Sequence, residues 1–211
     1  KDNLPNLYDF KDKLLFRRKS LPEDEAERGV IGIPRVLNMY ELYPFWHTFF
    51  TKLGFAVYHS PLSSRELYLR GQGTIPSDTA CFPAKLAHGH IEFLSRLGLD
   101  AILYPCMTYN LDEGLSDNHY NCPVVAYYPE VIAGNCPEIK GTKFIYDYVG
   151  IHRPKDFVKK IHAVLQRHWP DIRKDEVRRV MVIGAGWAGA NLVHEIQRGS
   201  YGNCVPVLVV D

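Results

Sequence analysis

The sequence has no marked excess of either charge and no long hydrophobic run. Its 25 Lys and Arg residues nearly balance 24 Asp and Glu residues, so it lacks the broad positive field that binding to a phosphate backbone requires. No apolar stretch approaches the roughly 20 residues that a membrane helix needs, and the first residues do not resemble a signal peptide. We therefore expect no nucleic acid partner, no membrane association and a cytoplasmic location.

Cysteine is also scarce. Five residues at irregular spacing are an odd number that does not suit a disulfide framework, which leaves metal or redox chemistry, or inert thiols. Hydrophobic residues make up 46% of the chain, enough for an ordinary buried core. The chain starts without Met and stops at the end of a strand-like run, so we expect both ends to be cut.

Strands alternate with helices along the chain. This order predicts an α/β fold with an open, mostly parallel sheet and helices on both faces. Predicted strands cover residues 30–33, 55–58, 101–104, 123–126 and 143–146, and predicted helices cover 41–53, 63–71, 84–97 and 155–167.

The pattern breaks at Trp169-Pro170-Asp171 and restarts at Arg178. After that point, residues 180–183 predict a strand, 191–197 a helix and 205–210 a further strand. The expected organisation is a domain at 1–168, a linker at 169–177 and, at 178–211, an incomplete unit that corresponds to the first β-α-β unit of a Rossmann-like domain.

Three cysteines lie in loops beside the predicted strands and helices of the first domain: Cys81, Cys106 and Cys122. Loops at the carboxyl edge of an open α/β sheet converge on one crevice. Cys81 and Cys106 are expected to meet there, whereas Cys122 precedes its predicted strand and has to reach over from a loop. Three thiolates that leave one position open suit a [4Fe–4S] cluster.

Two other interpretations of these cysteines stay open. Free cysteine is among the most buried residue types, and the spacing is not that of compact ferredoxin motifs, so the thiols also suit a hydrophobic core. A zinc site would need a fourth ligand, for which the candidates are His88, His90 and His119.

Several motifs occur in order within residues 31–125. They are IGIPRVLNMYE at 31–41, YPFW at 43–46, IPS at 75–77, CFPAK at 81–85, HGH at 88–90, YPC at 104–106 and NCPVV at 121–125. With these motifs, residues 4–165 resemble the domain of large 2-hydroxyacyl-CoA dehydratase activase-related proteins, which is similar to the iron–sulfur subunits of 2-hydroxyglutaryl-CoA dehydratase. The resemblance implies that Cys81, Cys106 and Cys122 bind a [4Fe–4S] cluster.

The same resemblance implies a function. In such dehydratases an ATP-driven activase delivers one low-potential electron to the cluster, and the electron passes to the thioester carbonyl of a 2-hydroxyacyl-CoA, whose ketyl radical expels hydroxide. The chain is then an iron–sulfur component of a dehydratase/activase system, lyase-type if it is itself catalytic. It has no recognisable ATPase motif, so the expected partner is an activase in another domain or protein, with an acyl-CoA as substrate.

Three charged or titratable side chains near these motifs have two interpretations each. Lys85 and His88 share a helical face after Cys81, where they either contact a CoA phosphate and tune the site or are a solvated lysine and a core histidine. Arg35 follows Pro34 at the end of the first strand, as either an anion contact or a surface salt bridge.

A second motif, G-x-G-x-x-G, stands at Gly184, Gly186 and Gly189, with Asp211 about 20 residues later. Between a strand and a helix, such glycines let backbone approach a pyrophosphate, and the carboxylate accepts from a ribose hydroxyl. Residues 178–211 also resemble the nucleotide-binding start of polysaccharide-biosynthesis nucleoside-diphosphate-sugar epimerase/dehydratase proteins. This predicts NAD binding, weak in so short a unit.

Two alternative functions follow beside the iron–sulfur one. The chain is also compatible with a fragment of an NAD-dependent nucleotide-sugar epimerase/dehydratase, or with a non-catalytic electron-transfer or interaction domain.

Overall fold

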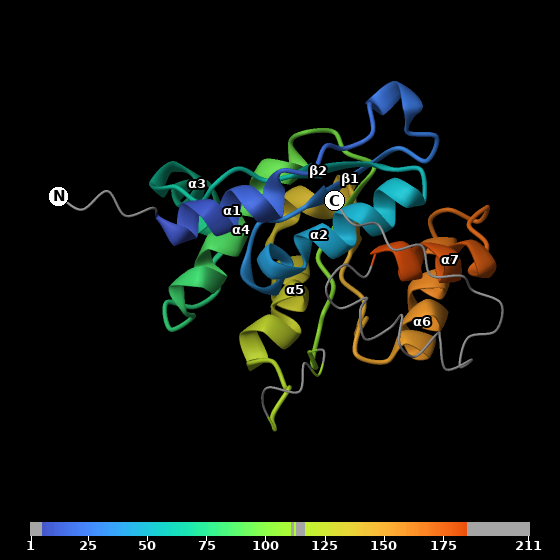
Figure 1. Cartoon of the computed structure of the whole chain (residues 1–211). Helices are drawn as coiled ribbons and strands as arrows, with labels where there is room; N and C mark the ends of the chain where they lie inside the picture. The colour runs from blue at the N-terminus through green and yellow to red at the C-terminus, as the bar shows by residue number, and fades with distance from the viewer. Residues whose placement is uncertain (1–5, 111, 113–116, 185–211) are drawn as a thin grey trace.

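The computed structural model describes residues 6–110, 112 and 117–184 (Figure 1). Short 3-10 helices at Glu23–Glu25, Gln72–Thr74 and Pro137–Gly141 connect some of the main elements. The main elements are α1 Leu7–Phe16, β1 Val30–Ile33, α2 Leu37–Lys52, β2 Ala56–His59, α3 Arg65–Gly71, α4 Phe82–Ser95, β3 Ala101–Leu103, α5 Pro123–Asn135, β4 Lys143–Ile145, α6 Pro154–Gln166 and α7 Lys174–Gly184.

The described strands form one parallel sheet in the order β2-β1-β3-β4. Ile31 of β1 pairs with Val57 on one side and with Ala101 on the other, and Ala101 of β3 pairs with Lys143 of β4. The open parallel α/β fold is thereby confirmed. The chain passes from β1 to β2 at one edge of the sheet and from β3 to β4 at the opposite edge. The topological switch point therefore lies between the carboxyl ends of β1 and β3.

Helices cover both faces of the sheet. Right-handed crossovers place α2 on one face and α4 and α5 on the other, because the strand order reverses after β2. On the α2 face, the ring of Phe157 from α6 packs against Phe45, Trp46 and Phe49, with centroid distances of 5.7, 5.9 and 5.7 Å. These rings are buried and form the aromatic part of the core.

The strand predicted at 123–126 is wrong, because residues Pro123–Asn135 form helix α5. Pro123 occupies the first helical position, where its missing N–H costs nothing. Cys122 caps the helix, and its sulfur accepts from the N–H of Val125 at 3.5 Å. A short apolar run such as Val124-Val125-Ala126 has no periodicity that separates a strand from a helix.

The strand predicted at 180–183 is also wrong, because α7 runs through this segment. Asp175 and Glu176 lie in its first turn, where negative charge stabilises a helix. Val177 and Val180 are buried on one side, whereas Arg178 and Arg179 are exposed. The apolar residues at 180–183 therefore continue a helix that begins before them.

The segment expected to be a linker is packed into the domain. Trp169, Ile172 and Val177 are buried, and Trp169 donates from its indole N–H to the carbonyl of Arg28 at 3.1 Å. Residues 185–211, and with them most of the predicted β-α-β unit, lie outside the described residues, so a second unit stays a prediction. In the described part of the chain, no helix is long and apolar enough to cross a membrane.

Candidate functional site

Three helices begin at the carboxyl edge of the sheet. α2 follows β1 directly, α5 follows β3, and α4 leads back into β3, so it runs antiparallel to the strands. The N-terminal ends of α4 and α5 both lie toward the bottom of Figure 1. A helix N-terminus carries unpaired N–H groups and a partial positive charge. This edge therefore favours an anionic ligand or a thiolate.

Two of these helices have a cysteine as the N-cap. Cys81 precedes α4 with φ −62° and ψ 151°, and Cys122 precedes α5 with φ −61° and ψ 153°. Each is exposed, and each is followed by a proline in the first turn, Pro83 and Pro123. Both cysteines thus have nearly the same backbone conformation at the start of a helix.

Cys106 reaches the same edge from β3. Its N–H donates to the carbonyl of Asp147 at 3.1 Å, and its own carbonyl accepts from the N–H of Val149 at 3.2 Å. Burial, with a contribution from Glu130, raises the pKa of the Cys106 thiol to about 11. The thiol is therefore neutral in the protein alone, and a bound metal would have to displace its proton.

Asn121 joins the loops that carry Cys106 and Cys122. Its side-chain amide donates to the carbonyl of Met107 at 2.8 Å, and its backbone N–H donates to the carbonyl of Thr108 at 3.0 Å. Because α5 replaces the expected strand, Cys122 already lies at the carboxyl edge and does not have to reach over from the far side of the sheet.

Tyr104 follows β3 directly, two residues before Cys106. Its side chain is fully buried, and its hydroxyl has no hydrogen-bond partner. Burial raises the pKa of Tyr104, and the nearby side chains of Tyr128, Cys106 and Cys81 raise it further. Cys106 follows two residues later on the same extended segment, so its side chain lies on the same face of the sheet as that of Tyr104. Sequence reasoning missed Tyr104 as a site residue, although it stands in the Tyr-Pro-Cys motif.

The donor set fits an iron–sulfur cluster in chemistry but is not preassembled. Among residues 6–110, 112 and 117–184, no group of three or more His, Cys, Asp or Glu side chains is arranged to hold a metal ion. Cys81, Cys106 and Cys122 share an edge of the sheet, and metal binding commonly completes the ordering of its ligands. Ligation by these cysteines stays a prediction.

The histidines considered as zinc ligands have other partners. His90 is buried and lies 2.6 Å from the hydroxyl of Ser60 and 2.9 Å from that of Ser63. His88 is buried and lies 3.0 Å from the hydroxyl of Tyr128. The Nε2 atom of His119 lies 3.4 Å from a carboxylate oxygen of the exposed Asp112. The first two are core residues whose ring nitrogens are already used.

Lys85 and Arg35 also have partners within the protein. The ammonium of Lys85 donates to the carbonyl of Asp78 at 2.7 Å. The guanidinium of Arg35 pairs with Asp12 and lies 3.8 Å from the ring centroid of Phe16. Arg35 therefore forms a largely buried ion pair within the protein and is not free to bind an anion.

The side chain of Asn38 links the segments that follow β1 and β3, on either side of the switch point. The sequence did not predict this contact. It lies in the first turn of α2, and its amide donates to the sulfur of Met107 at 3.1 Å. Leu37, which starts α2, has a φ of 46°, a strained value for a residue with a side chain. The turn after β1 is therefore fixed in an unusual shape beside the loop that carries Cys106.

The glycine motif lies almost entirely outside the described residues. Gly184 is the last residue of α7, so the segment before the motif is a helix and not the strand that a dinucleotide fingerprint requires. Gly186, Gly189 and Asp211 fall beyond the described chain. NAD binding stays a prediction.

Comparison with known families matches residues 30–194 to a family described as a CoA enzyme activase uncharacterised domain (DUF2229). The match includes all three edge cysteines and continues through the segment at 169–177. Comparisons with curated proteins and with solved structures found no match. Because the matched residues make up more than half of the chain, it belongs to the CoA enzyme activase domain family.

Proposed function

We propose that this domain is the iron–sulfur component of a CoA-linked activase/dehydratase system, with a [4Fe–4S] cluster on Cys81, Cys106 and Cys122. The observation that carries the proposal is that all three cysteines lie in segments at one edge of the sheet, where Asn121 joins the loops of Cys106 and Cys122. The family supports the link to CoA enzymes.

A bound cluster would supply one-electron transfer to a CoA thioester. The contribution of the chain is to hold and protect that cluster. Cys81 and Cys122 would hold it from the N-termini of α4 and α5, while the buried side chains of Tyr104 and Met107 exclude water on the sheet side. A dry wall of this kind limits side reactions of a reactive radical.

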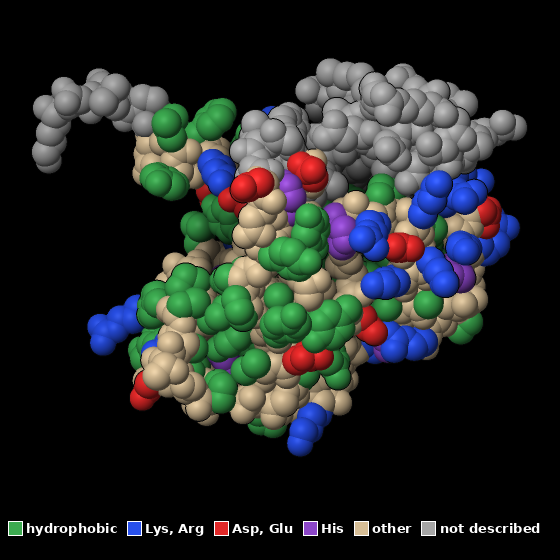
Figure 2. All heavy atoms as spheres, turned by 90° about the horizontal axis from the view of Figure 1, so that it is seen from below, with side chains coloured by type: hydrophobic (Ala, Val, Ile, Leu, Met, Phe, Trp, Pro, Cys, Tyr) green, Lys and Arg blue, Asp and Glu red, His purple; other side chains and the backbone are tan. Residues whose placement is uncertain are grey.

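The face around the cysteines is apolar. Hydrophobic side chains gather on the side seen from below in Figure 2, toward which the N-termini of α4 and α5 point. Phe82, which follows Cys81, is 59% exposed, and Tyr120, close before Cys122, is 74% exposed. Such a face suits an apolar covering. We propose that an ATP-dependent activase, with an acyl-CoA substrate, acts at this side.

The ligand assignment is tested by anaerobic reconstitution with iron and sulfide. The wild-type protein should bind roughly 4 Fe per chain, as three cysteine loops around one cluster predict. Cys81→Ser, Cys106→Ser and Cys122→Ser should each bind less iron. Cys136→Ser is the matched control in the described chain, because Cys136 is buried beside Thr74 and His88, and Cys204→Ser is a second control. Equal iron in all variants would refute the assignment.

The same site also suits a non-catalytic electron-transfer domain, because the exposed thiols of Cys81 and Cys122 place one side of a cluster within reach of a docking protein. Turnover of a 2-hydroxyacyl-CoA by the reconstituted domain with an added activase separates the two functions. Product formation supports the dehydratase component, whereas cluster reduction without product supports electron transfer alone.

A further inference from the structure

Tyr104 carries a polar group that the protein itself does not use. The residue follows β3 and is 0% exposed. Its backbone N–H donates to the carbonyl of Ile145 at 2.9 Å, but its hydroxyl is buried without a hydrogen-bond partner. An unpaired buried hydroxyl destabilises a fold. Phenylalanine would fill the same space without that cost, so packing does not explain the hydroxyl.

Neighbouring Tyr128 shows how a tyrosine in this region is normally satisfied. Its hydroxyl lies 3.0 Å from a ring nitrogen of His88. The hydroxyl of Tyr104 has no such partner. Cys106 stands two residues after Tyr104 on the same extended segment, because the backbone N–H groups of both residues donate to the neighbouring chain, at Ile145 and Asp147. The two side chains therefore lie on one face of the sheet. The free donor and the proposed ligand Cys106 therefore lie on one face of the sheet, at the edge where α4 begins after Cys81.

We propose that Tyr104 is a positioning residue that donates a hydrogen bond to a sulfur of the cluster bound at Cys81 and Cys106, and so raises its reduction potential. The inference rests on the proposed function. A reduced cluster carries one more negative charge than an oxidised one, so a fixed donor stabilises the reduced form more strongly. The same bond supplies the partner that the hydroxyl lacks within the protein.

Tyr104→Phe tests the inference in the reconstituted full chain. We expect the same iron content as in the wild type and a shift of the midpoint potential to a more negative value, measured by a dye-mediated dithionite titration. The matched control is Tyr43→Phe, since Tyr43 is a similarly buried tyrosine on α2 that packs against Phe16 and His59. This control should leave the potential unchanged.

A second measurement separates a role at the cluster from a structural role. The metal-free Tyr104→Phe protein should unfold at the same or a higher denaturant concentration than the metal-free wild type, because it loses an unpaired polar group. A lower unfolding midpoint would show that the hydroxyl is bonded within the protein and would overturn the inference.

The outcomes also separate this inference from the proposed function. An unchanged potential in a fully loaded Tyr104→Phe protein overturns the role of Tyr104 and leaves the cluster assignment in place. Failure of the wild type to bind iron and sulfide overturns both.

Discussion

Asn121, which directly precedes Cys122, is hydrogen-bonded to Met107, which directly follows Cys106. Its side-chain amide donates to the carbonyl of Met107 at 2.8 Å. The bond joins two positions that are separated by residues 108–120 of the chain, part of which lies outside the described residues. The geometry of the proposed cluster ligands therefore depends on an amide that is not itself a ligand.

Asn121→Ala should lower iron incorporation, because it frees the loop of Cys122 from that of Cys106. The lost hydrogen bond should cost about 1 kcal/mol of folding free energy. Asn135→Ala is the matched control, since Asn135 donates to the carbonyl of Val131 at 2.8 Å at the opposite end of α5. Iron content and denaturant unfolding check both variants, and equal iron in the two would contradict the role of Asn121.

Gly89→Ala should destabilise the packing of α3 on α4. A Cβ atom at Gly89 would lie 1.9 Å from the carbonyl oxygen of Leu67, so the helices would have to separate. The expected loss is about 1–3 kcal/mol. Gly134→Ala should stabilise by about 0.5 kcal/mol, because nothing lies within 4 Å of its added Cβ. Urea unfolding of both variants measures the difference, and a neutral Gly89→Ala would show that α3 does not pack this closely.

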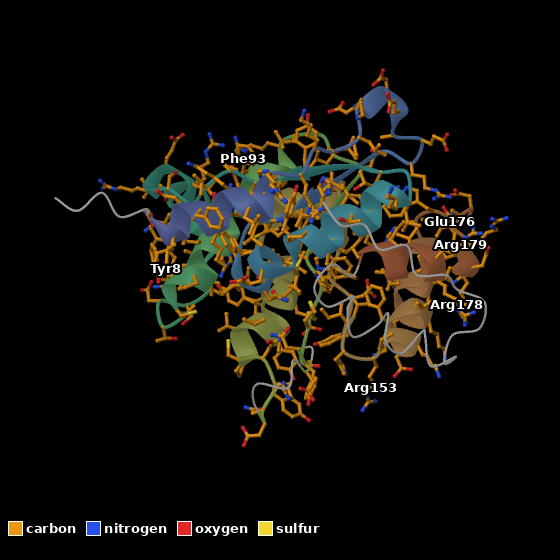
Figure 3. All side chains as sticks on the ribbon, in the orientation of Figure 1. Tyr8, Phe93, Arg153, Glu176, Arg178 and Arg179 are labelled. Atoms are coloured by element: carbon orange, nitrogen blue, oxygen red, sulfur yellow. The ribbon has the colours of Figure 1, made fainter. Side chains whose placement is uncertain are left out.

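The contact between Arg28 and Glu176 should make the attachment of α7 sensitive to acid. Arg28 donates to both carboxylate oxygens of Glu176, at 2.6 and 3.2 Å, and Figure 3 shows Glu176 on α7. The hydrogen bond from Arg28 lowers the pKa of Glu176 from the ordinary 4.5. The stabilisation is therefore fully present above pH 4.5 and is lost as the pH falls through the lower pKa of the folded protein.

Glu176→Gln should remove this part of the acid sensitivity and lower stability at neutral pH by about 1 kcal/mol. Hydrogen exchange of α7 amides between pH 3 and pH 7 is the measurement. An identical pH dependence in the variant and the wild type would contradict the prediction.

Two buried histidines should make the stability of the domain depend on pH at higher pH values than those at which Glu176 acts. Burial lowers the pKa of His88 and of His90 from 6.5 to about 4. The unfolded chain then binds more protons than the folded one, so the free energy of unfolding should fall as the pH drops from 6.5 towards 4. Urea unfolding across this range measures the slope. His90→Gln should flatten it, and an unchanged slope would show that His90 does not carry the effect.

Much of the fold could be predicted because its local signals agree. β1 has the predicted bounds at Val30–Ile33, since a short segment rich in β-branched residues stops before Pro34. The run Val124–Ala126 was assigned wrongly because a short buried helix and a short buried strand share the same apolar composition. α7 was missed because its buried residues, Val177 and Val180, continue into an apolar run that reads as a strand.

The candidate site was predictable only in part. Strand and helix ends indicated that Cys81 and Cys106 approach one edge of the sheet. The sequence contains no signal for the bond from Asn121 to Met107, or for the unpaired hydroxyl of Tyr104, because both depend on tertiary packing. The assignment of the cysteines to a cluster stays a prediction.

The most direct test is anomalous diffraction at the iron absorption edge from crystals of the anaerobically reconstituted chain. The account predicts one compact group of iron atoms at the carboxyl edge of the sheet, bonded to the sulfurs of Cys81, Cys106 and Cys122. Iron bound elsewhere while these three thiols stay unligated would contradict it.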